Sequence, residues 1–379
     1  MTVVDKMLGS KKIENYRIFF CLSSIGGGGA ERVASLLCNH WAGLGAQVTI
    51  LATAAVRSSG GYELDEEIEV LHLADIVAGE KNKFSRVRAM RRLFKTYTPD
   101  VIISFITDVN NASLIGVFGM GIPIIVSERS FPPARINETG TVNSWLRWAL
   151  YRFALPVVAQ TEDVKNWIIE NCPGSNVAVI PNPVQFPLPG RDTLDSDDDG
   201  LVQRNRLILG SGRLIASKRH DLAIRAFGEI AQDHPDTILV LLGDGPERSQ
   251  LEQLRDSLGL TNRVILRGQV ANAGAWYARA DIFVFPSSFE GFPNAVLEAL
   301  SYGIPTVCFD ILTGPRYLIE DHVNGILLPD NDHVTRLGNA LSELLGDSGL
   351  CRKLSENAVS VRENYSIERI SDLWRQHFS

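Results

Sequence analysis

The chain has 379 residues, of which 45 % are apolar and 21 % charged, and its formal net charge is −7. This composition is typical of a globular protein, and the length predicts two domains or one large α/β unit. The acidic balance argues against a general nucleic-acid binder, and we find neither a run of about 18 apolar residues nor a signal-peptide core, so we expect a cytoplasmic protein.

Short β-branched runs alternate with longer amphipathic stretches through the first half of the chain. This alternation predicts βα units and a parallel sheet, and the continuous apolar runs predict strands that are buried on both faces. The predicted strands are residues 17–23, 47–53, 68–73, 100–105, 122–127, 156–160 and 177–180.

Residues 181–205 interrupt the alternation. They are rich in Pro, Gly and Asp and lack periodicity, which predicts a linker with a loop excursion. A second series of strands follows at residues 206–212, 237–243, 263–268, 281–287, 305–310 and 325–329. We therefore expect two α/β domains that meet near residue 183, with a ligand site in the cleft between them, outside the carboxyl ends of the strands.

The first candidate site is the glycine-rich stretch "SSIGGGGAER", residues 23–32, between a predicted strand and a helix that ends near Leu44. Glycines let a ligand approach the backbone, and a helix N-terminus attracts anions. A tight strand–helix turn is the plain alternative. The motif is not a GxGxxG, and no acid ends the second strand to hold a ribose, so a nicotinamide dinucleotide is disfavoured.

The second candidate is "GSGRLIASKRHDLAIRAF", residues 210–227. Gly212, Arg213 and Lys218 follow a strand, and a helix is predicted to start near Arg219. Two cations beside a helix N-terminus suit a diphosphate leaving group, although such cations are also common in solvated loops.

The third candidate is "EGFPNAVLEAL", which follows the strand at residues 281–287. Pro293 suits a first helical turn and Gly303 a C-terminal cap, so we expect Glu290 in a loop above the sheet and Glu298 on a helix. A single glutamate is by default a surface residue, so the pair gains its meaning only from the other motifs.

The sequence shows no metal site and no cofactor motif. The five cysteines are dispersed and lack a CxxC pair, which fits reduced thiols. Asp244 stands alone in a strand–helix turn, and the acids of "DSDDDG", residues 195–200, lie in the predicted linker.

In their order and spacing these motifs resemble the retaining GT-B glycosyltransferases of family 4, the glycosyl transferases group 1 class. The resemblance covers nearly the whole chain. It implies two Rossmann-like domains facing across a cleft: residues 1–183 for the acceptor and residues 184–364 for the nucleotide sugar. A last helix within residues 365–379 would cross back onto the first domain.

The resemblance also implies roles for the motif residues. Arg213 and Lys218 would contact the donor diphosphate, Glu290 the sugar hydroxyls and Glu298 the ribose. The further residues that it places around the donor are Gly27, Gly28, Gly212, Gly291, Phe292, Pro293 and Asn294. Fixed cations and helix N-termini would stabilise the leaving diphosphate without a metal.

One departure from the family lies in "SERSFPP", where many relatives have His after Ser-Glu and this chain has Arg129. An arginine stays charged and does not shuttle protons, so we expect Arg129 to bind sugar hydroxyls or phosphate. We expect Glu128, with Asp108 or Asn110, to line the acceptor side.

Residues 81–95 hold seven basic residues among apolar ones. Through Lys83, Arg86 and Arg91 this segment could lie on anionic lipid or bind a lipid diphosphate, or it could be an ordinary surface helix with one packed face. Residues 143–156 favour a helix packed in the core.

The leading hypothesis is a retaining, metal-independent transferase of a bacterial type. It would move a hexose or N-acetylhexosamine, preferably from a UDP-sugar, to a lipid-linked saccharide at the cytoplasmic face of the inner membrane. A nucleotide-sugar epimerase on the same fold and a nonenzymatic sugar-nucleotide binding module are the alternatives.

Overall fold

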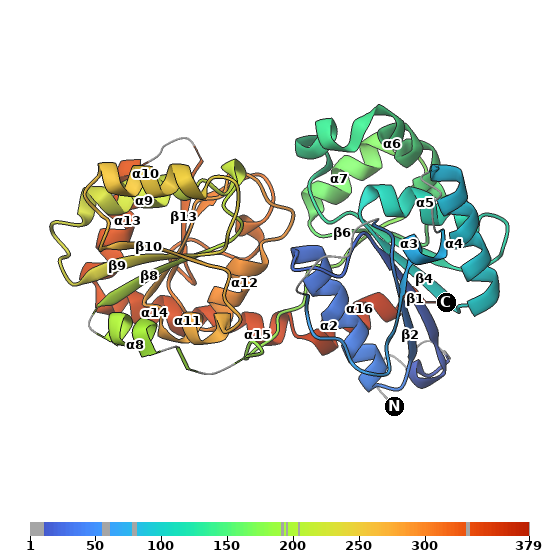
Figure 1. Cartoon of the computed structure of the whole chain (residues 1–379), viewed down its shortest axis with the longest axis horizontal. Helices are drawn as coiled ribbons and strands as arrows, with labels where there is room; N and C mark the ends of the chain where they lie inside the picture. The colour runs from blue at the N-terminus through green and yellow to red at the C-terminus, as the bar shows by residue number, and fades with distance from the viewer. Residues whose placement is uncertain are drawn as a thin grey trace. The chain divides into compact units, whose positions relative to one another are not determined.

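A computed structural model of the chain describes residues 11–54, 61–77, 82–190, 193–194, 196–203, 205–330 and 334–378. These residues divide into two compact units. The first comprises the described residues up to Pro183 together with those from Tyr365 onward, and the second comprises Val184–Asn364. Each unit is built on its own parallel sheet with helices on both faces (Figure 1). The predicted α/β fold class is therefore confirmed.

The first unit has a seven-stranded sheet in the order β3-β2-β1-β4-β5-β6-β7. Every strand predicted in the first half of the chain forms, and each pairs in parallel with its neighbours. The order reverses between β1 and β4, which makes their carboxyl ends the switch point of this sheet. The strands are β1 (Arg17–Leu22), β2 (Gln47–Ala52), β3 (Glu69–His72), β4 (Val101–Phe105), β5 (Ile124–Ser127), β6 (Val157–Ala159) and β7 (Val177–Val179).

Helices cover both faces of this sheet because its strands are apolar on both sides. One apolar cluster joins α2 and α16 to the sheet, and another joins α4, α5, η3 and α7 to the opposite face. The helices of this unit are η1 (Ile13–Asn15), α2 (Gly29–Gly43), α3 (Leu73–Ile76), α4 (Lys83–Tyr97), α5 (Thr107–Val117), η2 (Pro132–Arg135), α6 (Ile136–Leu150), η3 (Tyr151–Phe153), α7 (Glu162–Asn171) and α16 (Ile367–Arg375).

The C-terminal helix α16 lies against α2 and belongs to the first unit, although it follows the second in sequence. Ile370 and Trp374 enter the apolar cluster beneath α2. The indole Nε1 of Trp41 donates a hydrogen bond to Ser371 Oγ at 2.8 Å. A helix with one apolar stripe needs such a partner surface, and α2 provides it.

The second unit has a six-stranded sheet in the order β10-β9-β8-β11-β12-β13. All the strands predicted in the second half of the chain form. They are β8 (Arg206–Ser211), β9 (Thr237–Leu242), β10 (Val264–Gly268), β11 (Ile282–Phe285), β12 (Thr306–Asp310) and β13 (Ile326–Pro329). The order reverses between β8 and β11, which are paired through Ile282 with Ile208 and Phe283 with Leu209.

The helices of the second unit also cover both faces of its sheet. One apolar cluster holds α9, α10 and α13 against the sheet. On the other face, Tyr277 of α11 packs on Phe283 of β11, with ring centroids 5.6 Å apart. The helices are η4 (Ala216–Lys218), α9 (His220–Ile230), α10 (Arg248–Ser257), α11 (Ala273–Arg279), α12 (Asn294–Ser301), η5 (Pro315–Tyr317), α13 (Val334–Gly346), α14 (Ser348–Ala358) and α15 (Val361–Asn364).

The predicted linker contains a helix that the sequence analysis missed, α8 (Ser196–Gln203). Asp-rich sequences with an internal glycine have low helix propensity, so composition alone predicts a loop here. Tertiary contacts stabilise the helix instead. Val202 is fully buried and Asp198 forms an ion pair of 2.8 Å with Arg267.

Candidate functional site

The second unit brings two of the predicted motifs together at the switch point of its sheet. The chain leaves β8 through Gly212 and reaches Lys218 in η4, and it leaves β11 through Ser287 and reaches Glu290. Because β8 and β11 are neighbours and parallel, both segments lie at the same edge of the sheet. Residues more than 70 positions apart in sequence therefore meet.

Lys218 and Glu290 form an ion pair through Nζ and Oε1. Ser287 Oγ lies 2.7 Å from the same carboxylate oxygen, and the ammonium group lies 5.0 Å from the centroid of the Phe285 ring. Both charged side chains keep some exposure. The pair thus places a cation and a hydrogen-bond acceptor side by side, and both remain partly exposed.

Backbone contacts fix the two segments to each other. The amide of Ser288 donates to the carbonyl of Ser217 at 2.9 Å. Thr313 Oγ1, from the loop after β12, donates to the carbonyl of Glu290. Gly314 has φ +99°, and a Cβ there would lie 3.0 Å from Cβ of Glu290, so glycine allows this loop to approach closely. Ser287, Thr313 and Gly314 were not predicted as site residues from the sequence.

The rest of the "EGFPNAVLEAL" motif forms the turn into α12, as predicted. Gly291, Phe292 and Pro293 are buried, and α12 begins at Asn294 with Pro293 as the N-cap. Glu298 lies on α12 and is only 9 % exposed. The eight-residue spacing therefore separates a loop carboxylate from a helix carboxylate and does not place both on one helix face.

His220 opens α9 directly after the Lys218–Arg219 turn and was not predicted as a site residue. It is buried, with its ring against the backbone of Gly212 and Arg213 in the turn after β8. Burial, aided by the charge of Lys218, lowers the pKa of His220 to about 4, so the ring is neutral at physiological pH. Its place in "SKRHD", two residues after Lys218, is the signal that could have found it.

Arg213 follows Gly212 at the end of β8, and its side chain is exposed. Gly212 has φ +154°, and a Cβ there would lie 3.6 to 3.7 Å from Lys218 and His220. The turn after β8 therefore brings the backbone of Gly212 close to the lysine of the ion pair and to the buried histidine, and the exposed Arg213 is the next residue in the chain.

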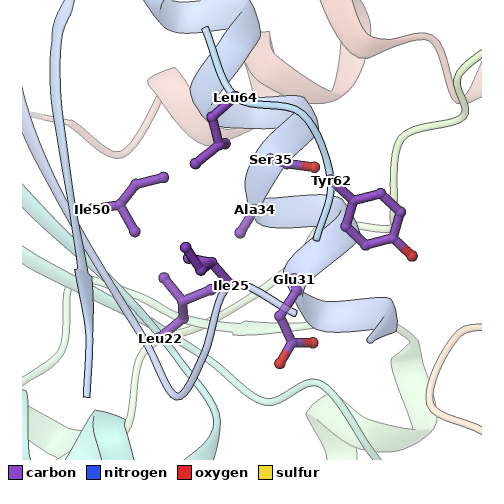
Figure 2. Close-up of a pocket in the computed structure, with 8 residues that line it drawn as sticks. All are labelled: Leu22, Ile25, Glu31, Ala34, Ser35, Ile50, Tyr62 and Leu64. Atoms are coloured by element: carbon purple, nitrogen blue, oxygen red, sulfur yellow. The ribbon is translucent and has the colours of Figure 1, made fainter. Parts of the chain in front are cut away.

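In the first unit, the glycine-rich loop joins β1 to α2 as predicted. Glu31 folds back over the helix N-terminus, where Ser24 Oγ donates to its Oε1 at 2.9 Å. A Cβ on Gly28 would lie 2.2 Å from Glu31 Oε2, whereas a Cβ on Gly27 would meet nothing within 4 Å. A small, largely apolar pocket lies behind the loop, with Glu31 at its rim (Figure 2). It is lined by Leu22, Ile25, Glu31, Ala34, Ser35, Ile50, Tyr62 and Leu64.

Arg129 follows β5 and lies near this loop. Its guanidinium donates to Asn182 Oδ1 and stacks over the ring of Phe105 at 4.3 Å. Burial lowers the pKa of Arg129 to about 9, while the nearby Glu31 carboxylate opposes this shift. The guanidinium therefore stays charged at neutral pH at the carboxyl edge of the sheet.

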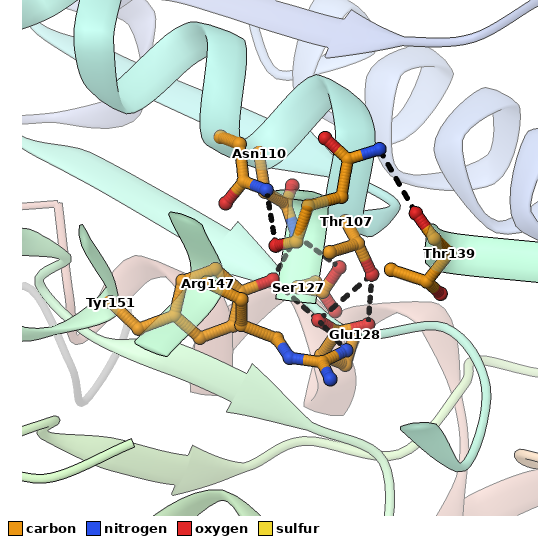
Figure 3. Close-up of polar contacts among 9 residues, drawn as sticks. Thr107, Asn110, Ser127, Glu128, Thr139, Arg147 and Tyr151 are labelled. Atoms are coloured by element: carbon orange, nitrogen blue, oxygen red, sulfur yellow. Dashed lines mark hydrogen bonds and ion pairs between the residues drawn. The ribbon is translucent and has the colours of Figure 1, made fainter. Parts of the chain in front are cut away.

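Glu128 and Asn110, two of the predicted acceptor-side residues, lie in the interior of the first unit. Both are buried, in a polar network that Figure 3 shows. Glu128 accepts hydrogen bonds from Thr107 Oγ1 at 3.0 to 3.1 Å and from the Tyr151 hydroxyl, and it lies 3.7 Å from Arg147. Burial and this carboxylate raise the pKa of Tyr151 well above its usual value. Both side chains therefore take part in the internal packing of the first unit, and their expected acceptor-side role stays a prediction.

Among the other predicted acceptor-side or membrane residues, Asp108 is exposed at the start of α5. Arg86 donates to the carbonyl of Thr53, and Arg91 donates to the carbonyls of Gly116 and Phe118 at 2.9 and 2.8 Å. Both arginines therefore brace neighbouring loops. The side chain of Lys83 lies outside the described part of the structure.

The segment at residues 143–156 is only partly the core-packing helix that we expected. Arg147 and Tyr151 are buried, but Trp145, Trp148 and Phe153 are exposed. The spacing of apolar residues did not distinguish the buried side of this segment from its exposed side, because tryptophans also occupy the exposed side of α6.

Within the described ranges, no group of three or more His, Cys, Asp or Glu side chains could hold a metal ion. In the same ranges no helix has the length and apolar character needed to cross a bilayer.

Two family models match the two units in turn. Residues 27–186 match the model described as Glycosyltransferase Family 4, and residues 193–361 match that of the glycosyl transferases group 1. The chain belongs to the group 1 glycosyltransferases. The resemblance to the group 1 glycosyltransferases of family 4 is thereby confirmed, while the retaining mode stays a prediction.

The chain is also similar to individual proteins and solved structures. The chain is 26 % identical over 378 residues to an N-acetylgalactosaminyltransferase of Campylobacter jejuni that acts on a diphospho-undecaprenol-linked saccharide, covering 94 % of this chain and 97 % of that protein. It is 32 % identical to the exopolysaccharide phosphotransferase SCO2592 of Streptomyces coelicolor over 295 residues, which are 76 % of this chain but 29 % of that protein. The crystal structure of Anabaena HepE in complex with UDP-glucose is similar to this chain with a TM-score of 0.79 and 20 % sequence identity. The match covers 96 % of this chain and 99 % of HepE, which supports the GT-B fold.

Proposed function

We propose that this glycosyltransferase moves a hexose or an N-acetylhexosamine from a UDP-sugar to a lipid-linked saccharide, with retention of the anomeric configuration. The observation that carries the proposal is the Lys218–Glu290 pair at the switch point of the second sheet. An ammonium group suits a phosphate, and a carboxylate suits sugar hydroxyls. The pair therefore offers both groups that a sugar diphosphate requires.

On donor binding, we infer that this ion pair opens. The ammonium of Lys218 turns to the diphosphate together with the exposed Arg213, and Glu290 accepts hydrogen bonds from the sugar. The turn that precedes Asn294, at the start of α12, adds backbone amides near the phosphates. Glu298, one helical turn further along α12, takes the ribose hydroxyls.

The first domain contributes the loop with Gly27 and Gly28 on the diphosphate side and Arg129 on the sugar side. The open space above Gly27 supports the approach of a ligand. The exposed carboxylate of Asp108 is our candidate for contact with the acceptor.

Transfer would not need a metal ion. Negative charge develops on the leaving diphosphate, and the released ammonium of Lys218, the guanidinium of Arg213 and the N-terminus of α12 stabilise it. Glu290 is engaged by the sugar hydroxyls and is not free as a nucleophile in this scheme. Attack by the acceptor on the same face that the diphosphate leaves would then preserve the anomeric configuration.

The names of similar proteins support the substrate classes. The two Campylobacter jejuni relatives are named for transfer to undecaprenol-linked saccharides. HepE was crystallised with UDP and with UDP-glucose. We take from them a UDP-sugar donor and a polyprenyl-linked acceptor in glycan assembly.

A donor screen tests the proposal. Each nucleotide sugar is added to the full chain, and the melting temperature is measured, because a ligand that binds the folded state raises it. The donor that raises it is then incubated with an undecaprenyl-diphosphate-linked saccharide, and the product linkage is determined by NMR. We expect transfer with the donor's anomeric configuration. An isomeric nucleotide sugar formed without acceptor would indicate an epimerase, and a raised melting temperature without transfer would indicate a binding module.

A further inference from the structure

The guanidinium of Arg129 is held from two sides within the first unit. On one side, its Nη2 donates to Oδ1 of Asn182, which also accepts a hydrogen bond from Nε2 of Gln160 at 2.7 Å. On the other side, the guanidinium stacks over the ring of Phe105 at 4.3 Å. Asn182, Gln160 and Phe105 are all buried. Because an arginine side chain has many rotamers, these contacts decide where its charge lies.

The Phe105 ring is itself supported by the C-terminal helix. The ring of Trp374 in α16 lies 5.8 Å from that of Phe105, and the ring of Phe20 in β1 lies 4.7 Å from it, measured between centroids. All three rings are fully buried. In a close-packed interior, the loss of one side chain lets its neighbours shift. A smaller residue at position 374 should therefore disturb the ring on which Arg129 rests.

Both supports belong to segments through which the chain passes between the two units. Asn182 directly precedes Pro183, where the chain leaves the first unit. The chain returns to this unit at Tyr365, and Trp374 lies in the helix that follows. Neither segment is near Arg129 in sequence, so only the fold brings them to one guanidinium.

The held guanidinium keeps its charge and part of its exposure. Arg129 is partly exposed, and its pKa, although burial lowers it to about 9, leaves it charged at neutral pH. A cation that is already oriented stabilises a charged or polar ligand without first being ordered. A guanidinium that moves freely would have to be ordered each time a ligand binds.

We propose that Asn182 and Trp374 are positioning residues that hold Arg129 for its contact with the donor. Trp374 acts through the ring of Phe105. This inference rests on the proposed function, in which Arg129 lies on the sugar side. Loss of either support leaves the charge in place but lets it move, and a displacement of about 1 Å can cost up to about a hundredfold in rate.

Double-mutant cycles test whether the two residues act through the arginine. Arg129→Gln should lower kcat/KM for transfer about a hundredfold, because a charged hydrogen-bond donor is lost. Asn182→Leu and Trp374→Leu should each lower it about tenfold. Added to Arg129→Gln, either change should cause no further fall, because residues that act as one unit are not additive. A residue that only stabilises the fold would lower the rate by the same factor in both backgrounds.

Two matched controls come from the same unit. Phe378→Leu removes a buried ring that packs on Trp41 in the same apolar cluster, and Asn111→Leu removes a buried asparagine of α5. Both should lower the melting temperature and leave the transfer rate unchanged. Trp374→Phe keeps an aromatic ring in place and should retain most of the rate. If Trp374→Leu does not fold, the Asn182→Leu cycle decides.

Crystal structures of the variants without ligand separate a failure of this inference from a failure of the proposed function. In Asn182→Leu and Trp374→Leu we expect the guanidinium of Arg129 to leave its position in the unaltered chain. An unmoved guanidinium in both variants, or rate effects that are equal with and without Arg129, would overturn the inference even though the unaltered chain transfers sugar. No transfer by the unaltered chain with any donor would reject both.

Discussion

Each unit contains a glutamate near the carboxyl end of a strand that pairs with a cation, and the two pairs differ in burial. Glu290 and Lys218 are 12 % and 19 % exposed, whereas Glu128 and Arg147 are 2 % and 3 % exposed. Glu128 is also bound by Thr107 and Tyr151, so its oxygens face protein donors. Glu290 lies in a loop and keeps more of its side chain exposed.

The difference separates a pair that holds the fold from a pair that can exchange partners. A buried pair is expensive to break because the remaining charge stays without water or partner. A partly exposed pair can open when a ligand replaces one partner. Both glutamates were candidate site residues from sequence, so burial is what distinguishes their roles, and the predictions below test that distinction.

The largest expected effect on stability is that of Glu128→Ala. The variant leaves the Arg147 guanidinium buried without its carboxylate, and we expect a loss of roughly 3–5 kcal/mol in the free energy of unfolding. Urea denaturation measures it. Pairing the change with Arg147→Met should restore part of the loss, since the uncompensated charge is then gone. A near-neutral single variant would contradict the structural role of Glu128.

Glu290→Ala should impair transfer and leave stability nearly unchanged, the opposite of what we expect for Glu128→Ala. We expect transfer to fall by about a hundredfold to a thousandfold in kcat/KM, because the sugar loses a charged hydrogen-bond acceptor in a fixed position. The melting temperature should change little. Rates with the donor found in the screen provide the measurement, and turnover close to that of the unaltered chain would reject the proposed site.

Lys218→Ala should reduce kcat/KM for the donor about tenfold to a hundredfold, since one of the two proposed diphosphate cations is lost. Arg225→Ala is the matched control, because Arg225 is an exposed cation on α9 that lies 3.9 Å from Asp221. Initial rates over a range of donor concentrations compare the two variants. Equal effects of both would mean that Lys218 acts only through general surface charge.

His220 predicts a smaller, pH-dependent effect on stability. Its pKa in the folded chain is about 4, below the value of about 6.5 for an exposed histidine. Between these values the unfolded chain binds the proton more readily, so acidification should cost roughly 1.4 kcal/mol of stability per pH unit. His220→Leu should lack this contribution. Urea denaturation at several pH values measures the free energy of unfolding of both chains. As the pH falls from about 6.5 towards 4, the unaltered chain should lose more of this free energy than the His220→Leu variant does.

No effect is expected from excess chelator. If Lys218, Arg213 and the N-terminus of α12 stabilise the diphosphate, then transfer should proceed at the same rate with EDTA present. Assays after dialysis against EDTA, with and without added Mg²⁺ or Mn²⁺, make the comparison. A rate that depends on added metal would refute the metal-independent mechanism.

The sequence by itself determined the strands, the division into two units and the members of the motifs. Each predicted strand formed, because a strand buried on both faces must be an unbroken apolar run, and such runs are visible without any tertiary contact. The positions of Pro293 and Gly303 at the ends of α12 were also local properties: Gly303 has φ +71°, a conformation that glycine adopts without strain.

Only the tertiary structure decided which of the candidate polar residues are buried. Glu128 and Glu290 look alike in sequence, since each follows a strand, and burial by Arg147, Tyr151 and Thr107 depends on segments distant in the chain. The same holds for the exposed tryptophans of α6 and for α8, whose Asp-rich sequence folds through Val202 and Arg267. Local sequence fixes backbone preference, whereas burial is a sum over contacts that the sequence order does not reveal.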